Sequence, residues 1–146
     1  MTIIEAKAVE KIYRSGELNF RALYGIDLKV NSGDFLALCG PSGSGKTTLL
    51  NLLGLLDEVS SGQVIVAGTV VANFEDKELA RLRRDHFGFI FQTFNLIPVL
   101  TALENVQLPM IKKGVEAGAS LKAAREVLAR VGLEAHFHRY PSQLSG

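Results

Sequence analysis

The sequence has little that would direct it out of a reducing, aqueous compartment. Among its 146 residues Cys39 is the single cysteine, which excludes an internal disulfide and favours a reducing compartment. The 16 Lys and Arg residues nearly balance the 15 Asp and Glu residues, which argues against a general nucleic-acid or anionic-membrane surface. No apolar run has the length of a membrane span, and Met1 leads directly into an alternating pattern instead of a secretory signal. We therefore expect a soluble, cytoplasmic chain that has no nucleic-acid partner and reaches a membrane only through another protein.

The sequence also has few residues of the types that bind metal ions or act as reactive thiols. His86, His136 and His138 have no metal-ligand spacing with cysteines or carboxylates, so we expect surface or structural roles for them. Cys39 ends an apolar run, and we expect a small buried side chain there, not a reactive thiol.

A glycine-rich run is the most informative feature that is present. Residues 40–48 read GPSGSGKTT and match G-x-x-x-x-G-K-[ST] at Gly40, Gly45, Lys46 and Thr47. The run follows an apolar segment and precedes an apolar helical pattern. The alternative is an ordinary Gly/Ser-rich turn, but the strand–loop–helix context favours a phosphate-binding loop.

Each residue type in this loop suits a triphosphate. Glycines let the backbone curl closely around phosphate oxygens, and the following helix adds its positive dipole end. Lys46 would contact the β- and γ-phosphates, Thr47 would ligate Mg²⁺, and Thr48 would donate toward the α-phosphate. The expected nucleotide-binding residues of the loop are Gly40, Pro41, Ser42, Gly43, Ser44, Gly45, Lys46, Thr47 and Thr48.

Periodicity and turn residues predict alternating strands and helices. The expected strands are residues 2–13, 23–30, 35–39, 63–67, 69–72 and 87–91. The first two expected helices are 46–56, directly after the loop, and a helix that is capped by Asn73 and reaches Arg84. A third begins with a Thr101–Glu104 capping box and ends near Pro109. A fourth ends at Gly132 and presents on one face Leu121, Ala124, Leu128 and Val131. Residues 112–119 are the expected flexible insertion.

Two later segments narrow the class of nucleotide-binding protein. Residues 89–96 read FIFQTFNL and residues 144–146 read LSG. Together with the loop they resemble the ATP-binding subunit of ABC transporters. The resemblance implies catalytic roles for Lys46 and Gln92, and Mg²⁺ contacts for Thr47 and Gln92. It also implies that the segment around Gln92 touches a membrane permease.

The same resemblance gives roles to three further residues. Ser145 and Gly146 match the start of the family's LSGGQ signature, which acts on the γ-phosphate held by the other subunit of a head-to-tail homodimer. Tyr13 matches an aromatic residue that stacks on adenine. The alternatives are a polar residue closing a buried strand for Gln92, an ordinary tail for Ser145 and Gly146, and a core or edge-strand tyrosine for Tyr13.

The whole pattern is most similar to the lipoprotein-releasing, macrolide-exporting and cell-division branch of the family. It implies an α/β fold: a P-loop NTPase core with an antiparallel β-subdomain and a helical subdomain, with the C-terminal part of the core missing. Residues 1–146 would form an incomplete ATP-binding domain, with the core and β-subdomain up to about residue 95 and the helical subdomain from about residue 96.

The implied function is ATP-driven export or lipoprotein release through a permease. The family's later aspartate, glutamate and histidine have no counterpart before Gly146, so we expect the chain to bind MgATP and to hydrolyse it very slowly. An unpaired apolar edge at 35–39 would also favour self-association or marginal stability. The alternative is a catalytically silent nucleotide-binding module, or a regulatory one of the cell-division type.

Overall fold

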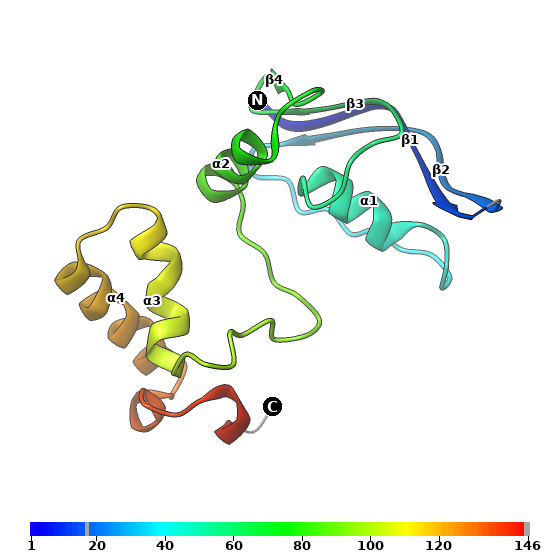
Figure 1. Cartoon of the computed structure of the whole chain (residues 1–146). Coiled ribbons are helices and arrows are strands. Elements are labelled where there is room, and N and C mark those ends of the chain that lie inside the picture. Colours follow the sequence, from blue (N-terminus) through cyan, green and yellow to red (C-terminus); the bar gives the residue numbers. More distant parts are fainter. Residues whose placement is uncertain (17, 145–146) are drawn as a thin grey trace. The chain divides into compact units, whose positions relative to one another are not determined.

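The chain forms two units, Met1–Phe87 and Gly88–Gly146, and each is described here by itself (Figure 1). The computed structural model describes residues 1–16 and 18–144. Two predicted site residues, Ser145 and Gly146, therefore lie outside the described residues. Among the residues that are described, no helix combines the length and apolar character needed to cross a membrane.

Unit 1 is built on an antiparallel sheet. Strands β1 (Thr2–Ser15) and β2 (Leu18–Asn31) form a long hairpin, and β3 (Ser61–Val66) and β4 (Thr69–Val70) follow on the other side of β1, in the order β2-β1-β3-β4. The strands predicted at 2–13 and 23–30 are confirmed, although both extend further toward the turn than the alternating pattern indicated.

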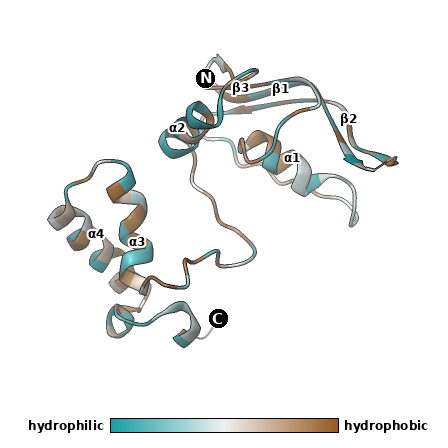
Figure 2. Ribbon diagram, viewed as in Figure 1, coloured by the Kyte–Doolittle hydropathy of each residue, from teal (hydrophilic) through white to brown (hydrophobic). Residues whose placement is uncertain are grey.

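The core of unit 1 lies between this sheet and helix α1 (Lys46–Leu53). Three leucines of the helix are buried, and they pack against apolar side chains of β1, β2 and β3. The core residues are Ala6, Val9, Leu23, Leu49, Leu52, Leu53, Leu55, Val64 and Val66. Helix α2 (Asp76–His86) buries none of its residues completely and is largely hydrophilic, as Figure 2 shows.

Two of the predicted strands are wrong. Residues 35–39 and 87–91 have no strand structure, and Phe35 is 98% exposed. These runs are apolar, but a strand also needs a place in a hydrogen-bonded sheet, and the sheet of the described residues consists of β1 to β4 alone. Cys39 is consequently exposed, which corrects the expected burial.

Unit 2 is helical. Helices α3 (Ala102–Lys112) and α4 (Ala117–Arg130) pack together, and the short 3-10 helices η1 (Glu134–His136) and η2 (Pro141–Gln143) follow. Leu103, Ala124 and Leu128 form the buried core of this unit. The predicted capping box is confirmed, since Thr101 accepts from the Glu104 N–H while the Glu104 carboxylate accepts from the Thr101 N–H.

Several helices begin or end at other residues than predicted. Helix α1 ends at Leu53, three residues earlier than expected. Asn73 has a φ of 68°, so it belongs to a left-handed turn, and the cap of α2 is Glu75. Pro109 lies inside α3 instead of ending it.

The expected flexible insertion at 112–119 is only partly confirmed, because residues 113–116 form the connection between the helices while Lys112 still belongs to α3 and residues 117–119 already belong to α4. At the other end of α4, Gly132 adopts a φ of 75° and stops the helix as predicted. Val131 follows the last helical residue and is 65% exposed, so it is not part of the buried face.

Candidate functional site: a phosphate-binding loop

The loop at residues 40–48 follows the irregular segment 34–39 after β2 and includes the first turn of α1. Gly45 occupies the cap position of the helix with a φ of 86°, a conformation that glycine adopts without strain. A Cβ atom at this position would lie 2.8 Å from the Ala22 carbonyl oxygen and 2.8 Å from the Leu23 Cδ2 atom. Gly45 is therefore required both by its backbone conformation and by its close approach to β2.

Lys46 folds back across the loop. Its ammonium donates to the carbonyl oxygens of Gly40 at 2.9 Å and Pro41 at 2.7 Å, and to the Ser44 hydroxyl at 3.2 Å. The positive charge thus lies on the same loop that leads into the N-terminus of α1, where no side chain caps the helix. This combination of a cation and unsatisfied backbone donors attracts anions.

The loop lines a cavity of about 510 Å³ that runs from Ser42 to Thr48 and also includes two residues of β2. These two residues are Ala22 and Phe20, and Phe20 is 62% exposed. Phe20 is not among the site residues predicted from the sequence. The sequence feature that could have indicated Phe20 is an aromatic residue near the beginning of the second strand, but the position of this residue at the cavity depends on the register of the β1–β2 hairpin.

That register contains a bulge at the site. Lys11 pairs with Leu23 and Ile12 pairs with Arg21, so Ala22 is an extra residue on β2. Tyr13 then pairs directly with Phe20. Residues directly opposite each other on antiparallel strands present their side chains on the same face, with Cβ atoms about 5 Å apart. The bulge therefore makes Tyr13 the cross-strand neighbour of an aromatic residue that lines the loop cavity.

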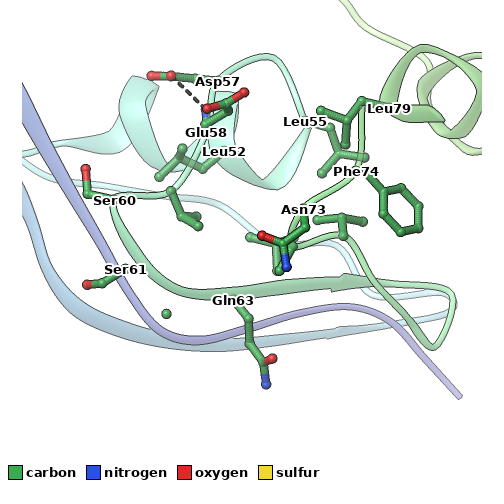
Figure 3. A pocket seen from close by; sticks show the side chains of 15 residues that line it. Leu52, Leu55, Asp57, Glu58, Ser60, Ser61, Gln63, Asn73, Phe74 and Leu79 are labelled. Atoms are coloured by element: carbon green, nitrogen blue, oxygen red, sulfur yellow. Dashed lines mark hydrogen bonds between the residues drawn. The ribbon is translucent and has the colours of Figure 1, made fainter. Parts of the chain in front are cut away.

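A second cavity of unit 1, of about 360 Å³, has a different character (Figure 3). Apolar side chains line much of it, including Leu52, Leu55 and Leu79, and the Asp57 and Glu58 carboxylates lie at its edge. Two carboxylates would repel a phosphate, whereas the loop cavity offers Lys46 and a helix N-terminus. Between the two cavities, the electrostatics favour an anion at the loop.

Gln92 belongs to unit 2 and lies in an irregular, exposed segment between α2 and α3. The segment carries exposed apolar side chains, among them Ile90 at 102%, Phe94 at 76% and Val99 at 78%. Further along, the Asn105 side chain bonds to the backbone of Ile97 through both its amide oxygen and its amide nitrogen. The segment is thus exposed in its middle and fastened to α3 at its end.

The described part of the chain, residues 1–16 and 18–144, holds no cluster of three or more His, Cys, Asp or Glu side chains that could bind a metal ion by themselves. The Thr47 residue at the loop is exposed. Mg²⁺ commonly binds through one or two protein oxygens, substrate phosphates and water, so the Thr47 hydroxyl beside a phosphate site fits that ion.

Comparison with known proteins gives consistent matches. Residues 23–146 match the family model described as ABC transporter. An uncharacterized ABC transporter ATP-binding protein of Thermotoga maritima is 46% identical over 99% of the chain, which spans 62% of that relative. The lipoprotein-releasing system ATP-binding protein LolD of Alcanivorax borkumensis is 45% identical, and the chain spans 63% of its length. The macrolide export ATP-binding/permease protein MacB of Azoarcus sp. is 46% identical, and the chain spans 22% of it.

A solved structure is also similar. The ATP-binding cassette MJ0796, a dimer in a post-hydrolysis state bound to ADP and Pi, has a TM-score of 0.91 and 42% identity, with 98% of this chain and 63% of that chain covered. The match confirms the predicted α/β fold class. The matches to LolD and MacB agree with the predicted branch.

Proposed function

The chain belongs to the ABC transporter family, and from this premise we propose that it binds MgATP at residues 40–48 as part of an ATP-binding subunit. That subunit would couple ATP binding and hydrolysis to export or lipoprotein release through a membrane permease. The observation that carries the proposal is the loop itself, where Gly45 closes the backbone against β2 and Lys46 holds a positive charge at the N-terminus of α1.

The proposed binding roles follow from the positions of the loop residues. Lys46 would exchange its carbonyl partners for β- and γ-phosphate oxygens, which carry full negative charge and bind an ammonium more strongly. The loop's backbone N–H groups and the Thr48 hydroxyl would hold the remaining phosphate oxygens. Mg²⁺ would be held by the Thr47 hydroxyl and neutralise charge on the phosphates.

Tyr13 is proposed to stack on the adenine ring, and Phe20 extends the same aromatic wall at the loop cavity. Gln92 is proposed to reach the Mg²⁺ and the attacking water. Ser145 and Gly146 would act on the γ-phosphate held by the second subunit of a head-to-tail dimer.

A permease is the proposed membrane partner, and the exposed apolar side chains beside Gln92 support its docking there. Ile90, Phe94 and Val99 offer a contact that a polar solvent-facing segment would lack. Pull-down with a permease of the lipoprotein-releasing or macrolide-exporting type tests this part, and Phe94→Ser should weaken the complex. Unchanged capture by this variant would contradict docking at the segment.

The nucleotide proposal is tested by equilibrium dialysis of the full chain with MgATP and with Mg²⁺ and inorganic triphosphate. Lys46→Ala should weaken both ligands by more than about tenfold, because it removes a charge-assisted contact to the phosphates. Lys77→Ala, which changes an exposed lysine on α2, is the matched control and should bind as the unaltered chain does. Equal binding by the Lys46→Ala chain would refute the assignment of the loop.

A further inference from the structure

Tyr13 is fixed by residues that lie outside every motif discussed above. Its hydroxyl donates to the Asp57 Oδ2 atom at 2.9 Å. The other oxygen of the same carboxylate accepts from the Lys11 ammonium at 2.6 Å and from the Glu58 N–H at 2.7 Å. The Lys11 ammonium also donates to the Glu58 carbonyl at 2.6 Å and lies 4.9 Å from the centre of the Tyr13 ring.

These contacts join β1 to the loop that leaves α1. Lys11 is 9% exposed, an unusual environment for a lysine, and its charge is matched by the Asp57 carboxylate. Figure 3 shows Asp57 and Glu58 together on that loop, with the hydrogen bond between them. The Tyr13 ring is therefore held by a bond at its hydroxyl and by an ammonium on one face, yet it stays 40% exposed.

We propose that Lys11 and Asp57 are positioning residues that orient the Tyr13 ring for the nucleotide base and so set how much the base adds to nucleotide binding. This inference rests on the proposed function, because it takes a nucleotide at the loop and its base at Tyr13 as given. Lys11 and Asp57 touch neither the phosphates nor the base in this account, and they act through the ring.

The geometry gives two physical reasons for this role. With the ammonium on one face, only the opposite face of Tyr13 is available to a purine, so the pair selects the side on which a base stacks. Both aromatic faces carry negative quadrupole charge, so a cation beneath the tyrosine reduces its repulsion toward a base above it. A hydroxyl bond to Asp57 also restricts rotation of the ring, which lowers the ordering cost of stacking.

The electrostatics of Asp57 keep the arrangement intact near neutral pH. Burial acts most strongly and raises the pKa of this carboxyl, but the hydrogen bonds from Lys11, Tyr13 and the Glu58 N–H together hold the pKa below its ordinary value. The carboxylate is therefore ionised under physiological conditions and pairs with Lys11.

A plain structural brace is the competing explanation, in which the pair only ties β1 to the α1 loop. The two explanations differ in what a substitution does to two ligands. A brace supports the whole of unit 1, so its loss would weaken every ligand of the phosphate loop. A positioning role concerns the base alone, so its loss would leave a base-free triphosphate unaffected.

The experiment compares binding of MgATP and of Mg²⁺ with inorganic triphosphate by calorimetry, using the full chain. The unaltered chain should bind MgATP about tenfold more tightly, because stacking on an aromatic residue contributes at about that level. Tyr13→Ala should remove this advantage completely. Lys11→Met and Asp57→Asn should reduce it to about twofold while triphosphate binding stays unchanged.

Lys7→Met is the matched control, since Lys7 is a half-exposed lysine of the same strand whose ion pair with Glu5 lies at the surface. This variant should keep the full advantage of MgATP. A second readout is tyrosine fluorescence, which can be measured directly because the chain has no tryptophan whose emission would mask it. MgATP should quench part of the fluorescence of the three tyrosines in the unaltered chain, and this quenching should disappear in Tyr13→Ala and fall in Lys11→Met.

Each outcome decides between the explanations. A Lys11→Met chain that keeps the tenfold advantage overturns the positioning role, and so does one that loses both ligands equally, since that result identifies a brace. Equal affinity of the unaltered chain for both ligands also overturns it, while leaving the phosphate loop intact. Failure of the unaltered chain to bind either ligand would instead refute the proposed function itself.

Discussion

The two units of this chain hold their candidate functional segments with polar anchors of different kinds. In unit 1 the charged Lys11 side chain bonds to Asp57 and to Glu58, which lie 46 and 47 positions away in the sequence. In unit 2 the neutral Asn105 amide bonds to the backbone of Ile97, Leu100 and Thr101, all within eight positions. The first anchor depends on a complete sheet and helix, whereas the second needs one loop and one helical turn.

This contrast has a thermodynamic consequence. An ion pair between distant segments forms only when the β1–α1 packing is complete, so it should be lost together with the sheet. The Asn105 bonds are local and can persist or break with little involvement of unit 1. Three predictions test whether the units differ in this way.

The largest effect is expected at the contact between the phosphate loop and the sheet. Gly45→Ala places a Cβ atom 2.8 Å from the Ala22 carbonyl oxygen, at a residue with a left-handed backbone conformation. The free energy of unfolding of unit 1 should therefore fall by about 3 kcal/mol. Gly43→Ala is the matched control, because Gly43 has a φ of 79° but nothing within 4 Å of the added atom, and it should cost about 1 kcal/mol. Urea unfolding, followed through the amide signals of β1 and β2, measures both.

Equal losses in the two glycine variants would contradict the close approach of Gly45 to β2. A loss that spread equally to the amide signals of α3 and α4 would break the comparison between the units, because it would show that they unfold as one.

An intermediate effect is expected from the anchor of unit 2. Asn105→Ala removes the side-chain hydrogen bonds to the Leu100 and Thr101 carbonyls, at 3.0 Å each, and leaves the Ile97 N–H without its acceptor. The free energy of unfolding of unit 2 should fall by about 2 kcal/mol. Glu126→Ala, at an exposed position of α4, is the control and should change the free energy of unfolding by less than about 0.5 kcal/mol.

Amide hydrogen exchange gives the sharper measurement for this variant. The Ile97 N–H bonds to the Asn105 amide oxygen, so its protection should fall in Asn105→Ala while the amides of β1 keep theirs. Unchanged protection at Ile97 would show that the loop between Gln92 and α3 is held by something other than Asn105.

The distinction between local and distant anchors also explains what the sequence could predict. The Thr101–Glu104 capping box could be predicted because residue type and short spacing define it, and the prediction of a phosphate-binding loop at 40–48 depends on the same kind of signal. Phe20 was missed because its place at the loop cavity depends on the bulge at Ala22, and the Lys11–Asp57 pair was missed because nothing in the spacing marks it. The strand expected at 35–39 was wrong because apolar character alone does not supply a neighbouring strand.

The smallest effect is expected on acidification, and it should reach unit 2 first. Glu104 and Glu116 cap the helices of unit 2, and backbone hydrogen bonds, chiefly from Thr101 and Gly118 respectively, hold the pKa of each carboxyl below its ordinary value of 4.5. Burial raises the pKa of Asp57, but hydrogen bonds from Lys11, Tyr13 and Glu58 keep it below its ordinary value of 3.8. In all three cases the folded chain favours the ionised form.

The sign of the effect follows from these directions. A carboxyl whose pKa is depressed by folding contributes stability above its unfolded pKa, and it loses that contribution as the pH falls through the folded pKa. The caps of unit 2 therefore begin to weaken below about pH 4.5, and the Lys11–Asp57 pair begins to weaken below about pH 3.8. Between pH 5 and pH 8 neither anchor should change, since all three carboxylates stay ionised.

Two backbone amide NMR signals report on the two carboxylates separately, because each N–H donates to the carboxylate concerned. The Thr101 N–H bonds to Glu104 at 2.8 Å, and the Glu58 N–H bonds to Asp57 at 2.7 Å. In an NMR titration from pH 7 downward neither signal should shift above about pH 5, because the pKa of each carboxyl lies below its ordinary value, and Asp57→Asn should flatten the Glu58 response at lower pH while leaving that of Thr101 unchanged. A Glu58 signal that shifts above about pH 5 would contradict the lowered pKa of Asp57, and the distant anchor would then be weaker than its contacts indicate.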